Sequence, residues 1–323
     1  MMRFVAGRLV ESLIVLLIMS FVVYLLIGLM PGDPVDLMIA GDPKLTSADI
    51  ARLKAVYGLD QPLSDRYFAW LGAAITGDFG NSRLHVRPVT EIMGPFLINT
   101  TVLMGASFAL SVAIAIPLGV IAALRPHSKL DHIINLLCFA GISIPVFWLA
   151  LMLMMVFSVW LGILPASGVA TVGDGSLGDR LLHLVLPTLT LTVFSIGHYT
   201  RYVRAAMMET LRQDFIRTAR AKGASSARML WRHALPNALI PVVTIIALSF
   251  GGLFSGALVT ETMFAYPGMG KMIYAAIMGN DYNLALIGLL FATLLTLIGN
   301  LLADIAYAWL DPRISYGGGG ART

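Results

Sequence analysis

Charged residues are scarce in this chain. Asp, Glu, Lys and Arg make up only 12% of its 323 residues, whereas a soluble domain usually carries about 25%. Hydrophobic residues account for 58%. With so little polar surface available, the chain is expected to be an all-α protein embedded in a lipid membrane. A soluble enzyme or a soluble binding domain is excluded.

Cysteine is almost absent, since Cys138 is the one residue of its kind. A single thiol cannot form an internal disulfide, and Cys138 lies in an apolar run, where a packing role is expected. The six histidines show no metal-ligand spacing, and no G-x-S-x-G sequence occurs. We therefore expect no metal site and no catalytic residues.

A phosphate-binding loop is also missing. No stretch matches G-x-x-x-x-G-K-[ST], the loop that cradles nucleotide phosphates. The nearest sequence, Gly270-Lys271, continues with Met272. The chain is therefore expected to hold no cofactor of its own and not to be an enzyme, and any ATP and Mg would be used by partner subunits.

Long apolar runs dominate what is present. Six of them reach the length of about 20 residues that a helix needs to cross a bilayer. They cover Leu9–Met30, Asn99–Leu124, Ile133–Leu161, Leu181–Val203, Ala238–Thr260 and Leu284–Leu310. The first run is too long for a signal peptide and is expected to be retained. Prolines within the runs, Pro145 among them, are expected to be tolerated.

The basic residues indicate the orientation. With both termini inside, 14 of the 22 Lys and Arg residues fall in inner segments, and six of the remaining eight lie in one long outer loop. Long loops count little in the positive-inside rule. Both termini are therefore expected in the cytoplasm of a bacterial cell, with the protein in its inner membrane. Because the positive charge follows this rule, nucleic acid is not expected as a partner.

Four parts are predicted along the chain. Residues 1–30 form a short inner tail and the first span, and residues 31–93 form an external subdomain. Residues 94–310 hold five further spans, and residues 311–323 form an inner tail. The external part is expected to be a small helical subdomain rather than a disordered linker. One helix would begin at Ser47 and carry Ile50, Leu53, Val56 and Tyr57, and a second would carry Tyr67, Phe68, Trp70 and Leu71.

The inner loop over residues 204–236 is the most informative segment. Good helix formers from Arg212 to Lys222 end at Gly223, a common C-terminal stop. Ser225 or Ser226 can cap a second helix over Ala227–Ala234. A basic helical hairpin of this kind can rest on anionic headgroups, or it can act as a lever that a partner moves.

The same loop resembles the EAA loop of ABC importer permeases. In that pattern, Glu-Ala-Ala is followed after three residues by Gly, and Ile-x-Leu-Pro comes nine residues later. Gly223 and Leu235-Pro236 match, while Arg217, Thr218 and His233 depart from the Glu, first Ala and Ile positions. The form Arg-Thr-Ala-Arg-Ala-Lys-Gly is typical of the dipeptide, oligopeptide and nickel permeases. Further similar segments include Ser143–Trp148 and Glu261–Gly270.

This resemblance implies a type I ABC importer permease fold and a set of partners. They are a second homologous permease subunit, two cytoplasmic ATPases and an external substrate-binding protein. The first helix of the loop would dock into the ATPase. By resemblance, the coupling residues are Asp214, Arg217, Thr218, Ala219, Arg220, Lys222 and Gly223.

Polar groups within or beside the spans are the candidates for an outer gate or a solute pathway. Glu261 at the outer end of span five is expected to shape the gate, and His198 and Asn300 are weaker lining candidates. Asp304 is either a lining residue or, preferentially, the partner of Arg201 or Arg204 in an ion pair. Glu11 is expected to pair with Arg8 or to extend toward water rather than to line a path.

Two other classes of protein stay open from the residues alone. An ion-coupled transporter or channel would need mid-membrane charges and inverted repeats, which are few or absent. A membrane-embedded enzyme lacks a recognisable nucleophile. A permease moving peptides or peptide-like solutes by alternating access is favoured. The sequence leaves the solute open among dipeptides, oligopeptides, nickel chelates, opines, glutathione and others.

Overall fold

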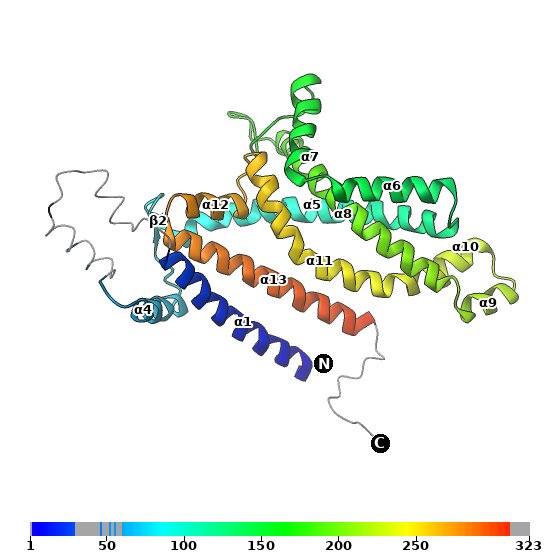
Figure 1. Cartoon of the computed structure of the whole chain (residues 1–323), viewed down its shortest axis with the longest axis horizontal. Coiled ribbons are helices and arrows are strands. Elements are labelled where there is room, and N and C mark those ends of the chain that lie inside the picture. Colours follow the sequence, from blue (N-terminus) through cyan, green and yellow to red (C-terminus); the bar gives the residue numbers. More distant parts are fainter. Residues whose placement is uncertain (1, 30–45, 47–51, 53–54, 56–59, 311–323) are drawn as a thin grey trace, which may run out of the picture.

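The computed structural model describes residues 2–29, 46, 52, 55 and 60–310. These residues form an elongated bundle of helices with one two-stranded hairpin (Figure 1). The elements in chain order are α1 (Met2–Gly28), α4 (Leu63–Ile75), β1 (Asn81–Ser82), β2 (Arg87–Pro88), α5 (Val89–Leu124), α6 (Lys129–Ser143), α7 (Val146–Leu153), η1 (Met154–Trp160), α8 (Leu177–Thr210), α9 (Asp214–Ala221), α10 (Ser226–Arg228), η2 (Met229–Ala234), α11 (Leu235–Met263), α12 (Met269–Met278) and α13 (Tyr282–Leu310).

Four helices in the described part are long and apolar enough to cross a membrane alone, namely α1, α5, α8 and α13. The pair α6 and α7–η1 makes a fifth span if it is counted as one. α11 covers the predicted fifth span with 29 residues, which also exceeds the required length. The expected all-α membrane fold of about six spans is confirmed.

The third span is not the single helix that the sequence predicts. α6 and α7–η1 meet at an angle of 101°, so the predicted span is sharply bent at Pro145. Pro145 has no N–H to donate, and its ring drives the preceding residue out of the helical region. Ile144 is accordingly extended, with φ −78° and ψ 125°. Pro117, Pro187 and Pro241, by contrast, lie inside continuous helices.

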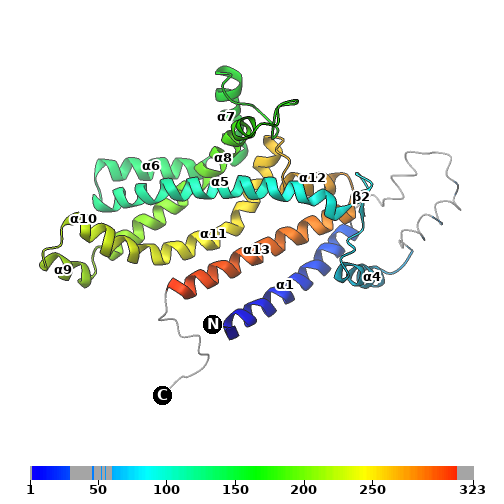
Figure 2. The same cartoon turned by 180° about the vertical axis from the view of Figure 1, so that it is seen from behind.

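Two packed clusters organise the bundle. At one end, α1 and the first turns of α5 pack with α12 and α13 around Val89, Met272 and Leu284. At the other end, α5, α8 and α11 pack with the loop helices α9 and η2. Figure 2 shows α4, the hairpin and α12 at the first end and α9 and α10 at the opposite end.

Small residues allow the central helices to approach closely. A Cβ atom on Gly119 of α5 would lie 2.6 Å from the Val203 side chain of α8. A Cβ atom on Gly197 of α8 would lie 2.5 Å from the Cys138 carbonyl oxygen of α6. Such contacts between small residues are a common way for helices to pack in membranes. α8 is thereby held between α5 and α6.

The predicted second helix of the external subdomain is confirmed as α4. Tyr67 is buried, and its hydroxyl is 2.8 Å from the Ser20 hydroxyl of α1. Tyr24 and Trp70 complete an aromatic group around it. Aromatic side chains of this kind gather where a membrane meets water. The helix predicted from Ser47 to Tyr57 lies outside the described residues.

Candidate functional site

The inner loop forms the helical hairpin that its sequence predicts. α9 carries one buried side chain, Ile216, which is 1% exposed and packs with Met207 of α8 and Met229 of η2. The same cluster includes Val203 and Val242 of the two long helices on either side of the loop. α9 is therefore fixed through Ile216 to α8, η2 and α11.

Gly223 ends α9 in the way the sequence indicates. Its φ is +80°, a left-handed conformation that favours glycine. The Ala224 N–H donates to the Ala219 carbonyl at 3.1 Å, and the Gly223 N–H donates to the Arg220 carbonyl at 3.0 Å. This pair of bonds is a Schellman motif. No atom lies within 4 Å of a Cβ built on Gly223, so backbone conformation, and not space, requires glycine here.

Ser225 begins the second helix, as one of the two predicted caps. Its hydroxyl accepts a hydrogen bond from the Arg228 N–H at 3.3 Å. α10 then continues through the π-helical turn η2 into α11 without a break. The predicted helix over Ala227–Ala234 is thus the start of the fifth span itself, which stiffens the connection between loop and membrane.

The outer face of α9 is polar and open. Arg217 and Asp214 form an ion pair of 3.2 Å at the surface, with side chains 77% and 92% exposed. Ala219 is half-buried, and the other coupling candidates, Thr218, Arg220, Lys222 and Gly223, are exposed. Such surface pairs contribute little to stability. The structure brings all seven candidates together in the short stretch made of α9 and the two residues that follow it.

Two exposed aromatic side chains beside this face were not singled out in the sequence. Phe215 of α9 is 42% exposed and Trp231 of η2 is 66% exposed. Both lie in a segment with few other large apolar side chains, and this contrast is the feature of the sequence that could have identified them. A large aromatic side chain left open next to a polar helix is a common feature of protein interfaces.

An ion pair that the sequence did not reveal joins α6 to α8. Arg204 Nε lies 2.7 Å from Asp131 Oδ1, and Arg204 Nη2 lies 2.7 Å from Asp131 Oδ2. The Asp131 side chain is 4% exposed. It also accepts from the His127 N–H at 2.9 Å and from the Asn135 amide at 2.7 Å. A two-pronged, nearly buried pair with further donors is a specific link between two helices.

At the opposite end, Glu261 is fully buried and holds the turn between α11 and α12. Its carboxylate accepts from the Lys271 N–H at 3.1 Å and from the Thr100 hydroxyl of α5. Thr100 in turn accepts from the Met269 N–H at 2.7 Å. A carboxylate beside the first N–H groups of a helix is favourably placed. Glu261 thus ties three helices together where it was proposed to shape a gate.

Two residues next to Glu261 depend on this arrangement. A Cβ on Gly268 would collide with the Glu261 carboxylate, so the turn has room only for glycine. Tyr266 also packs here, and burial, followed by the nearby Glu261 charge, raises the pKa of its phenol to about 12. The whole segment from Glu261 to Gly270 is therefore one closely fitted unit.

The hairpin of β1 and β2 is fastened to the corner between α12 and α13. The Asp281 carboxylate accepts from the Ser82 hydroxyl, from the Leu84 N–H at 3.0 Å and from the Leu284 N–H at 3.3 Å. Arg83 donates to the Gly279 and Asn280 carbonyls. The hairpin leads directly into α5, which begins at Val89, ten residues before the predicted span.

The remaining pathway candidates are scattered. Asp304 pairs with Arg8 of α1 at 3.0 Å, so the expected pairing with Arg201 or Arg204 is wrong: α13 lies against α1, and Arg204 is held by Asp131. Arg8 also pairs with Glu11 at 3.0 Å, as predicted. Asn300 is half-buried on α13. His198 is half-buried on α8, and the structure does not bring it near the other three. Among the described residues, no group of His, Cys, Asp or Glu is placed to hold a metal ion.

Comparisons with known proteins agree with this architecture. Residues 115–316 match the family described as the binding-protein-dependent transport system inner membrane component, and residues 1–87 match the N-terminal part described for the same components. An oligopeptide transport system permease protein of Bacillus subtilis is 40% identical, covering 98% of this chain and 100% of the relative. A di/tripeptide transport system permease protein of Pseudomonas aeruginosa is 36% identical, covering 98% and 99%.

Solved structures show the same fold. An inward-facing conformation of the MetNI methionine ABC transporter aligns with a TM-score of 0.56 at 19% identity, over 69% of this chain and 97% of the solved one. The structure of an amino acid ABC transporter aligns with a TM-score of 0.51 at 13% identity, over 68% and 94%. With its helical bundle and matching family regions, this chain belongs to the binding-protein-dependent transport system inner membrane components and is a multi-pass permease subunit with the type I ABC importer fold.

Proposed function

We propose that this permease moves peptides or peptide-like solutes across the bacterial inner membrane by alternating access. The relatives described above, which match nearly the whole chain, are peptide permeases by name. ATP and Mg would be used by partner subunits, since the sequence has no phosphate-binding loop. The chain would accordingly be a transport subunit without ATPase activity of its own.

The proposal is supported mainly by the arrangement of α9, which is exposed on one side and packed against the bundle on the other. Its seven coupling candidates, from Asp214 to Gly223, form a mostly exposed polar surface, while Ile216 fastens the helix to α8 and α11. A helix that is open on one side and anchored on the other can receive a movement and pass it on. Docking of an ATPase on this face would move both spans together.

The partners follow from the same architecture. One permease chain would pair with a second, homologous permease subunit, and two cytoplasmic ATPases would bind the α9 side of the pair. An external binding protein would deliver the solute to the opposite end. The subdomain over residues 31–93, with its fastened hairpin, is the surface proposed to receive it, and residues 94–310 would form the transport domain.

Both termini would lie in the cytoplasm. The basic loop helices support this direction through the positive-inside rule, and α1 begins beside the end of α13, where Arg8 meets Asp304. Residues 311–323 would then form an inner tail. Glu261 would act at the outer gate by holding the turn between α11 and α12, and Asp304, Asn300 and His198 are the proposed positions nearest a pathway.

Reconstitution tests this function directly. The chain would be expressed together with a second permease subunit, ATPase subunits and a binding protein, and the purified complex would be placed in liposomes. We expect ATP-dependent uptake of a labelled di- or oligopeptide that requires the binding protein. Uptake that proceeds without ATP and follows an ion gradient would instead make the chain an ion-coupled transporter.

A further inference from the structure

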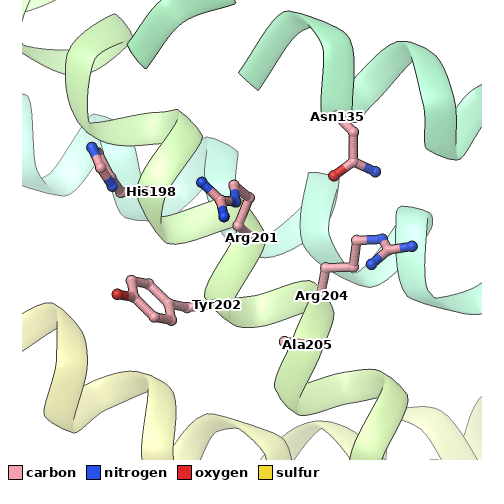
Figure 3. A pocket seen from close by; sticks show the side chains of 6 residues that line it. All are labelled: Asn135, His198, Arg201, Tyr202, Arg204 and Ala205. Atoms are coloured by element: carbon pink, nitrogen blue, oxygen red, sulfur yellow. The ribbon is translucent and has the colours of Figure 1, made fainter. Parts of the chain in front are cut away.

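A polar pocket lies between α6 and α8, away from the proposed gate. It has a volume of about 330 Å³. Figure 3 shows its lining, which is Asn135 from α6 and His198, Arg201, Tyr202, Arg204 and Ala205 from α8. The α8 residues recur at three- and four-residue spacing, so they share one face of that helix. No role in coupling or in the outer segment uses this face.

Within the described part of the chain, one positive charge in the pocket has no carboxylate partner. Arg204 is committed to Asp131, but across the described residues no carboxylate lies within ion-pair distance of the Arg201 guanidinium. Arg201 instead rests over the Phe139 ring, with Cζ 4.8 Å from the ring centroid. This contact leaves the N–H groups at the guanidinium edge open. Arg is the side chain best suited to bind a phosphate through several N–H groups at once.

The helix α6, which contributes Asn135 to the pocket, also carries exposed apolar side chains. Leu136 and Phe139 of α6 are 68% and 51% exposed, and the neighbouring Leu137 is 66% exposed. In a membrane-embedded helix such side chains suit acyl chains. Basic side chains in the pocket and exposed apolar side chains on α6 together suit a ligand with a charged headgroup and an apolar tail.

The depth of the pocket matches a headgroup. Asn135 lies six residues after Lys129, where α6 begins, a rise of about 9 Å along a helix. The short loop before Lys129 is on the side of the basic loop helices. Basic pockets between membrane helices near the cytoplasmic surface are typical sites for anionic lipid headgroups.

We propose that this pocket binds the phosphate of an anionic phospholipid from the cytoplasmic leaflet. Arg201 would donate to the phosphate oxygens, and Tyr202 and His198 would supply further polar contacts. The acyl chains would lie along Leu136 and Phe139. A lipid held here would brace α6 against α8 beside the Asp131–Arg204 ion pair. The proposal removes His198 from the solute pathway and assigns it to the lipid site.

Native mass spectrometry of the purified complex tests this site without measuring uptake. The chain would be purified with its co-purifying subunits from membranes rich in phosphatidylglycerol and then washed with a delipidating detergent. We expect the wild type to retain one more phosphatidylglycerol than Arg201→Gln, whose affinity for that lipid falls about tenfold on loss of a charge-assisted contact. Arg201→Lys should retain an intermediate amount. Arg125→Gln, which removes an exposed charge on the same side outside the pocket, should match the wild type.

Three outcomes would overturn the proposal. Equal lipid retention by wild type and Arg201→Gln would show that Arg201 holds no lipid. Displacement of the lipid by inorganic phosphate in the wash would mean that the pocket binds free phosphate and that the acyl chains contribute nothing. A raised KM for peptide in Arg201→Gln with unchanged lipid retention would place the pocket on the solute pathway.

Discussion

Asp131 and Arg204 form a two-pronged ion pair, with both N–O distances at 2.7 Å, between the start of α6 and the inner part of α8. The two residues are 73 positions apart in the sequence. Because α8 continues toward α9, the proposed coupling helix, this pair fixes α6 to the part of the bundle that an ATPase is proposed to move.

Removing one member of the pair should destabilise the inner end of the bundle. In Asp131→Ala, the Arg204 guanidinium, 23% exposed, loses its partner. Breaking a buried pair from one side costs about 3–5 kcal/mol. We expect a lower Tm for the detergent-purified complex. The double variant Asp131→Ala/Arg204→Met should recover part of the loss, and strictly additive losses would show that the two side chains do not interact.

Truncating the anchor of α9 should uncouple the transporter. Ile216→Ala removes the single buried side chain of that helix, and core truncations of this size cost about 2–5 kcal/mol. We expect ATPase activity to persist in the complex but to lose its stimulation by loaded binding protein, together with ATP-driven uptake. Ile133→Ala, the same truncation at an exposed position of α6, serves as the control. Normal stimulation in Ile216→Ala would contradict the anchoring role.

A methyl group at Gly268 should disrupt the outer turn. The new Cβ would collide with the Glu261 carboxylate, which must then give up its bonds to Lys271 or Thr100. We expect Gly268→Ala to abolish uptake while the ATPase still co-purifies. Gly7→Ala is the matched control, because a Cβ there meets nothing within 4 Å and alanine favours the α1 helix by about 1 kcal/mol. Equal uptake by both variants would show that the turn has no part in gating.

Releasing the external hairpin should weaken the response to the binding protein. Asp281→Ala removes the acceptor for Ser82, Leu84 and Leu284. We expect a higher concentration of binding protein to be needed for half-maximal ATPase stimulation, with unchanged basal activity. The control is Glu11→Ala, which removes a 65% exposed carboxylate of α1 outside the 31–93 subdomain. If ATPase stimulation of Asp281→Ala depends on binding-protein concentration as in the wild type, the hairpin is not part of the docking surface.

Local signals in the sequence predict the local features of this fold well. Gly223 ends α9 and Ser225 caps the next helix because both effects depend on a few neighbouring backbone groups. Spans were predictable from apolar length alone. The partner of Asp304 was not, since any basic residue near the inner surface satisfies the same pattern. Only the packing of α13 against α1 selects Arg8.

The break at Pro145 shows the same limit. Four prolines lie in the predicted spans, and nothing in the sequence around them distinguishes one that breaks a helix from one that a helix accommodates. Three are accommodated inside helices, whereas Pro145 follows an extended Ile144 and separates α6 from α7. Likewise, Asp131 and Arg204 each lie in short polar stretches, and only the close packing of α6 on α8 at Gly197 brings them together.

Cysteine cross-linking tests the central claim, that α9 receives the ATPase. The buried Cys138 would first be replaced by alanine. A single cysteine would then be introduced by Arg217→Cys, or by Arg125→Cys as a control on the same side of the bundle. Each would be treated with a short bifunctional reagent in the assembled complex. We predict a cross-link from position 217 to the ATPase that changes in yield when ATP is added, and none from position 125. No cross-link from position 217 in an intact, active complex would contradict the account.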